Sequence, residues 1–178
     1  MKPRTFVLAS LIALLVFAAN SSAWGMEYSI GSGNDDWWTR YPDQSSGAGA
    51  QVNHPSWVLD ALKGKPVLIY VHKECDYCKP QTEAANKVAE EFKGKITYYE
   101  ISGDGSDSRA EEALMAYDPN GGVTYVPMTI ILTLAPGSDG EVGPVWHSSE
   151  EITGEDWIRT HIEDAISYFD ENSLAWKK

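Results

Sequence analysis

The most constraining feature of this sequence is an apolar segment that runs directly toward its only two cysteines. Residues 67 to 71, Val-Leu-Ile-Tyr-Val, form a continuous β-rich run, which is typical of a strand covered on both faces inside a sheet. Cys75 and Cys78 follow shortly after this run, and a helical pattern spans residues 81 to 93. The sequence therefore places both cysteines between a buried strand and a helix.

The predicted elements alternate between strand and helix in the middle of the chain. Strand, helix, strand and helix in this order predict parallel pairing through a right-handed crossover. Pro-Gly-Ser-Asp-Gly at residues 136 to 140 then predicts a hairpin. Thr153 and Asp156 form a capping-box-like start for the last helix. The sequence predicts helices near residues 55–62, 81–93, 110–117 and 153–169, and strands near residues 67–71, 96–101, 128–134 and 141–146.

Residues 1 to 23 have the composition of a secretory signal peptide. Lys2 and Arg4 precede an apolar stretch from residue 6 to 19, which is shorter than the roughly 20 residues of a membrane-spanning helix. Small residues up to Ala23 suit cleavage after that position. We expect an extracytoplasmic protein, periplasmic or secreted, without stable membrane insertion after cleavage. An uncleaved apolar anchor is the alternative.

The rest of the chain divides into three parts. Residues 24 to 53 form an N-terminal extension rich in Trp, Gly and Ser, residues 54 to 170 form one domain, and residues 171 to 178 form a tail. Trp37 and Trp38 would either pin this extension to the domain or stack on a sugar or a substrate protein. The net charge of −12 repels phosphate backbones, so nucleic acid is not an expected partner.

The spacing of the two cysteines suits redox chemistry carried out by the pair itself. With two residues between them, one thiolate can attack a disulfide while the other resolves the mixed disulfide. A purely structural disulfide is the first alternative in an exported protein. It is disfavoured because loop-closure entropy grows with loop length, so a loop this short gains least. The redox hypothesis requires no dissociable cofactor.

A metal site is the second alternative. His72, Cys75 and Cys78 follow one another at three-residue spacing, and an imidazole with two thiolates suits copper(I) or zinc. A closed zinc site needs a fourth ligand, for which His147 is the candidate. Such a site would make the chain a non-catalytic binding module.

The sequence resembles the thioredoxin family over residues 54 to 170. The resemblance rests on Cys-x-x-Cys at a helix start combined with Val126-Pro127 directly before the predicted hairpin. It implies an α/β, thioredoxin-like fold with a central mixed sheet flanked by helices, here with an N-terminal extension. It also implies a thiol-disulfide oxidoreductase that acts on protein disulfides and exchanges electrons with a redox partner.

The resemblance implies distinct roles for the two cysteines. Cys75 would be the attacking sulfur, because a helix N-terminus favours its thiolate. Cys78, one turn into the helix, would be the more buried, resolving thiol.

Four further residues would contact the substrate. A cis peptide bond between Val126 and Pro127 would lie beside the sulfurs and expose the backbone of Val126 to an extended substrate segment. Asp76 and Tyr77, between the cysteines, would border the same groove.

The chain departs from the family pattern beside the cysteines. Ile69 stands where thioredoxins carry a buried Asp that assists proton transfer, and Glu74 stands where a Trp is usual. The carboxylates of Glu74 and Asp76 oppose ionisation of Cys75, whereas neighbouring basic residues favour it. A less stabilised thiolate makes the disulfide less oxidising. We therefore expect a reductase or isomerase rather than an oxidase.

Overall fold

A six-stranded mixed sheet organises the described chain, which covers residues 27 to 177 of the computed structural model. The expected signal peptide and its cleavage site after Ala23 lie outside these residues. The strands are β1 (Ile30–Gly31), β2 (Trp37–Trp38), β3 (Val67–His72), β4 (Thr97–Ser102), β5 (Met128–Pro136) and β6 (Val142–Ser149). The helices are α1 (Ser56–Leu62), α2 (Cys78–Glu91), α3 (Ser108–Ala116) and α4 (Gly154–Asn172), with a final 3-10 turn, η1 (Ser173–Ala175).

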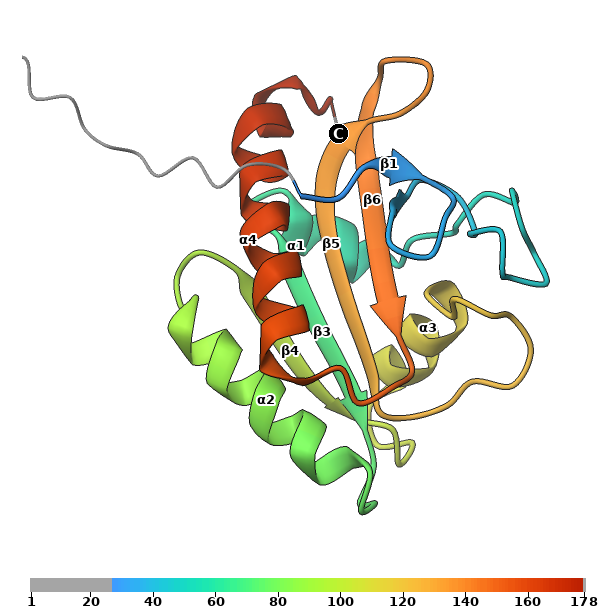
Figure 1. The fold of residues 1–178 in the computed structure, drawn as a ribbon, viewed down its shortest axis with the longest axis vertical. Helices are drawn as coiled ribbons and strands as arrows, with labels where there is room; N and C mark the ends of the chain where they lie inside the picture. Colours follow the sequence, from blue (N-terminus) through green and yellow to red (C-terminus); the bar gives the residue numbers. More distant parts are fainter. Residues whose placement is uncertain (1–26, 178) are drawn as a thin grey trace, which may run out of the picture.

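The strand order and directions confirm the predicted α/β, thioredoxin-like fold. The sheet runs β1-β2-β6-β5-β3-β4. β3 and β4 are parallel and joined through α2, whereas β5 is antiparallel to both β3 and β6. A βαβ unit followed by a β-hairpin and a closing helix is the thioredoxin arrangement. Helices α2 and α4 cover one face of the sheet, and α1 and α3 cover the other (Figure 1).

The continuous apolar run of β3 fills both layers of the core. Leu68 and Tyr70 pack with α2 and α4, whereas Val67, Ile69 and Val71 pack with α1 and α3. All five side chains are fully buried. A strand covered on both faces has no solvent side, which is why its sequence shows no alternation of polar and apolar residues.

The N-terminal extension is packed into the domain through its tryptophans. β2 pairs antiparallel with β6, where Trp38 lies opposite Trp146, and β1 adds to β2. Trp37 and Trp38 are buried. Asp164 of α4 accepts hydrogen bonds from Trp37 Nε1 at 2.6 Å and from the backbone N–H of Glu27 at 2.6 Å. Of the two alternatives for these rings, the structure therefore favours the one in which they pin the extension to the domain, because neither ring is open to a sugar or a substrate.

The capping box expected at Thr153 and Asp156 does not form, and that prediction is wrong. The Thr153 side chain makes no cap hydrogen bond; its Oγ1 instead accepts from Gln81 Nε2 at 2.9 Å. Gln81 Oε1 in turn accepts from the backbone N–H of Gly154 at 3.1 Å. The buried side-chain amide of Gln81 in α2 therefore makes the hydrogen bonds at the start of α4, in place of the expected bond between neighbouring residues of α4 itself.

Two buried histidines lie beneath the extension. His147 of β6 and His161 of α4 have ring centroids 4.7 Å apart, in a cluster of aromatic rings that includes Trp37 and Trp157. Burial lowers the pKa of both imidazoles, and that of His161 falls to about 3. His161 is only 2% exposed. The cluster favours neutral imidazoles because water cannot solvate a charge there.

We predict that acid destabilises the fold through this cluster. Because the folded pKa of His161 lies below the unfolded value of about 6.5, the unfolded chain binds more protons at lower pH. The free energy of unfolding should therefore fall from about pH 6.5 toward pH 3, by up to about 1.4 kcal/mol per pH unit through His161. The lowered pKa of His147 acts in the same direction. Burial raises the pKa of Asp164, which has the opposite sign and offsets part of this loss.

Denaturant unfolding at pH 7, 5 and 4 measures the effect. His161→Phe, which keeps a buried ring and removes the proton site, should show a flatter pH dependence than the wild type. Identical slopes for the two proteins would contradict the assignment.

Candidate functional site

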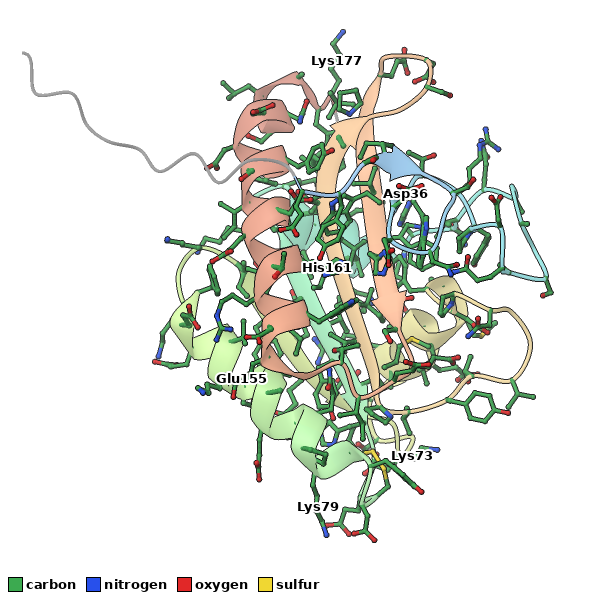
Figure 2. The ribbon with its side chains drawn as sticks, viewed as in Figure 1. Asp36, Lys73, Lys79, Glu155, His161 and Lys177 are labelled. Atoms are coloured by element: carbon green, nitrogen blue, oxygen red, sulfur yellow. A yellow bond between two sulfur atoms is a disulfide. The ribbon has the colours of Figure 1, made fainter. Side chains whose placement is uncertain are left out.

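Cys75 and Cys78 form a disulfide at the start of α2. Their Cα atoms are 5.2 Å apart. Cys78 is only 2% exposed, whereas Cys75 is partly exposed. Figure 2 shows the sulfurs beside Lys73 and close to Lys79, at the end of the molecule opposite Lys177. The two cysteines are therefore unequal in their access to solvent.

A hydrogen-bond donor at the start of α2 points at the sulfur of the more exposed cysteine, Cys75. The backbone N–H of Cys78, the first residue of α2, lies 3.1 Å from Cys75 Sγ. The first N–H groups of a helix have no partner within the helix and carry partial positive charge. A thiolate formed at Cys75 on reduction would be stabilised by this donor. Because α2 begins at Cys78, the expectation that this cysteine lies one turn into the helix is wrong.

Two hydroxyl groups hold the backbone of Cys78. The Tyr70 hydroxyl of β3 donates to the Cys78 carbonyl oxygen at 3.0 Å, and Thr82 Oγ1 donates to the same oxygen at 2.9 Å. Burial raises the pKa of Tyr70, so this hydroxyl keeps its proton and remains a donor. Tyr70 was not among the site residues predicted from the sequence, although its hydroxyl is a polar group inside an otherwise apolar strand. Ile69, beside it, faces the other layer of the core.

The charges around the disulfide are partly paired. His72 Nε2 lies 3.1 Å from Glu100 Oε1, and its ring stacks on Tyr70 with centroids 5.1 Å apart. Lys79 Nζ lies 3.0 Å from Asp76 Oδ1, in a pair that is mostly exposed. Exposed pairs of this kind stabilise a fold little. The effect of the pair between Lys79 and Asp76 is to reduce the negative potential that Asp76 would otherwise place beside the sulfurs.

An open cleft of about 690 Å³ borders the disulfide. Its walls come from the end of β3 and the first turn of α2, including His72, Cys75, Cys78 and Thr82. The partly exposed sulfur thus faces a space that solvent can enter.

The structure brings the predicted substrate-binding residues to the same end of the sheet. Val71 pairs with Met128, so the segment before β5 arrives where β3 leads toward Cys75. Figure 1 shows the connection from α3 to β5 returning to that end. The peptide bond between Val126 and Pro127 is cis, with Val126 half-buried.

The other two predicted contact residues project from the disulfide loop. Tyr77 is 74% exposed, and Asp76 is also exposed. Neither side chain contributes to the core. They are therefore accessible to a molecule that approaches Cys75.

The metal alternative finds no support between residues 27 and 177. No group of three or more His, Cys, Asp or Glu side chains there could hold a metal ion. His147, the candidate fourth ligand, lies in the aromatic cluster, with its Nδ1 2.8 Å from the Asp36 carbonyl oxygen. Within the same residues, no helix has the length and apolar character needed to cross a membrane.

Comparisons with known proteins give distant likenesses. No family model and no curated protein matches the chain. Similar solved structures include a malarial protein, 13% identical with a TM-score of 0.41, covering 57% of this chain and 97% of that one. They also include a DsbF homologue from Corynebacterium diphtheriae, 17% identical with a TM-score of 0.39, covering 58% and 74% respectively. Neither likeness informs on chemistry, which is therefore inferred from the residues of the site.

We predict that Tyr70→Phe weakens the anchoring of α2. The substitution removes one buried hydrogen bond to the Cys78 carbonyl oxygen, which Thr82 still satisfies. The free energy of unfolding should fall by about 1 kcal/mol, measured by denaturant titration. Tyr98→Phe is the control, because the Tyr98 hydroxyl donates to Asn86 at an exposed site. Equal effects of the two substitutions would contradict this account.

Proposed function

We propose that this protein is an exported thiol-disulfide oxidoreductase that acts on protein disulfides. The observation that carries the proposal is the asymmetry of the pair: Cys75 is partly exposed and accepts a helix N-terminal N–H, whereas Cys78 is buried. A structural disulfide has no need for such a difference. An attacking and a resolving sulfur do need it.

The exchange requires a reduced pair and consumes two electrons for each substrate disulfide. The Cys75 thiolate attacks one sulfur of the substrate, forms a mixed disulfide and releases the other substrate sulfur as a thiolate. Cys78 then loses its proton and attacks Cys75 Sγ, which closes the intramolecular disulfide and releases the second substrate thiol. A dithiol redox partner must reduce the pair again.

The backbone beside Pro127 supplies the substrate contact in this proposal. An extended segment of the substrate would pair with Val126, and Asp76 and Tyr77 would border it. Main-chain pairing gives affinity with little sequence preference. The substrates are therefore protein segments that contain cysteine, whatever their local sequence.

We infer a reductase or isomerase direction from the charges near Cys75. Glu74 and Asp76 are acidic neighbours, and Lys79 compensates only Asp76. The helix N–H of Cys78 and the nearby positive charge of Lys73 would stabilise the Cys75 thiolate, whereas Glu74 opposes it. A moderately stabilised thiolate leaves the disulfide less oxidising.

The closed disulfide suits an oxidising compartment outside the cytoplasm.

Insulin reduction tests the proposed function. The protein from residue 24 onward, supplied with dithiothreitol, should accelerate insulin precipitation, and Cys75→Ser should abolish the acceleration because no attacking sulfur remains. Cys78→Ser is the matched control: it keeps Cys75 and should accumulate a mixed disulfide with insulin, visible by mass spectrometry. If the wild type did not accelerate insulin precipitation, the proposed oxidoreductase function would be refuted.

A further inference from the structure

A single carboxylate joins the two ends of the loop that precedes Pro127. Residues 118 to 127, the cis-proline loop, connect α3 to β5. Glu150 follows β6, and its Oε1 accepts from the backbone N–H of Tyr125 at 2.7 Å. Its Oε2 accepts from Asn120 Nδ2 at 2.9 Å. Hydrogen bonds to a charged acceptor are the stronger kind.

The N-terminal extension braces the same loop from another side. The backbone N–H of Ser46 donates to the Asn120 carbonyl oxygen at 2.7 Å. Just before the loop, the Tyr41 hydroxyl donates to the carbonyl oxygen of Ala116, the last residue of α3, at 3.2 Å. Gly121 has a φ of 72°, and a Cβ there would collide with Ser46 Oγ. The close approach of the two segments therefore requires glycine.

The outer part of the loop is exposed. Val123 is 72% exposed and Tyr125 is 61% exposed, so packing of these side chains does not hold the loop in place. Between Gly121 and Pro127, the Tyr125 N–H bond to Glu150 ties the loop to the end of β6. This tie lies one residue before the Val126-Pro127 peptide bond.

We propose that Glu150 is a positioning residue for disulfide exchange at Cys75. It fixes the Thr124–Tyr125 peptide unit, the second peptide unit before the Val126-Pro127 bond, so that the backbone of Val126 is presented to the substrate in one geometry. The brace from residues 41 to 46 fixes the other end of the loop. Glu150 contacts neither sulfur and takes no part in proton or electron transfer. This role rests on the proposed function, because it concerns substrate positioning at the same site.

A positioning role and an electrostatic role give different kinetics. Loss of the tie should impair productive binding of an extended segment, which raises KM for insulin, whereas kcat and the thiol-disulfide equilibrium with glutathione should not change. A loop that is displaced by about 1 Å can reduce the efficiency of a reaction by an order of magnitude or more. We therefore expect about a tenfold rise in KM for Glu150→Ala.

The experiment compares Glu150→Ala, Glu150→Gln and the matched control Glu151→Ala. Glu151→Ala removes the same charge from the neighbouring exposed position. Glu150→Gln keeps an oxygen that can accept from Tyr125 and should recover much of the wild-type KM. Amide hydrogen exchange reports directly on the tie: the Tyr125 N–H should exchange at least about tenfold faster in Glu150→Ala than in the wild type.

Each outcome distinguishes this role from the proposed function. A wild type that reduces insulin, with a KM unchanged in Glu150→Ala, overturns the positioning role alone. A glutathione equilibrium that shifts together with KM also overturns it, because Glu150 would then act on the sulfurs. A wild type without insulin reduction refutes the proposed function and this role with it. Unchanged exchange at Tyr125 overturns the role whatever the activity.

Discussion

The double pairing of β3 is the constraint on which the rest of the structure depends. β3 is parallel to β4 on one side and antiparallel to β5 on the other. The register of the second pairing sets Val71 opposite Met128, so the disulfide and the cis-proline loop emerge at one end of the sheet. The parallel pairing requires a crossover, and α2 supplies it. The disulfide joins Cys78, the first residue of that helix, to Cys75 in the loop before it.

The polar contacts near the site fix the elements that bear it. Tyr70 holds the start of α2 to β3, and Gln81 links α2 to the start of α4. Glu150 and the extension fix the cis-proline loop. Each contact joins segments that the sheet alone does not tie together. The chemistry proposed for Cys75 therefore depends on a scaffold whose polar partners come from most of the chain.

Elements that local sequence patterns encode could be predicted, whereas contacts between residues far apart in the sequence could not. The β3 run, the cysteines at a helix start and the final hairpin have local signals, so their places were predicted within a few residues. Thr153 was predicted to cap α4 by itself, but its partner is Gln81, far away in the sequence. Glu150 carries no local sign of its contact with Tyr125. Such pairs exist only after the strands have paired, so periodicity cannot reveal them.

The central claim is that the Cys75–Cys78 disulfide is redox-active and not merely structural. Its most direct test is the reduction potential of the folded protein, measured by equilibration with glutathione buffers. The account predicts reversible exchange with a potential between about −180 and about −270 mV, the range that spans disulfide isomerases and thiol-disulfide reductases. A potential below about −300 mV, typical of structural disulfides, would contradict it.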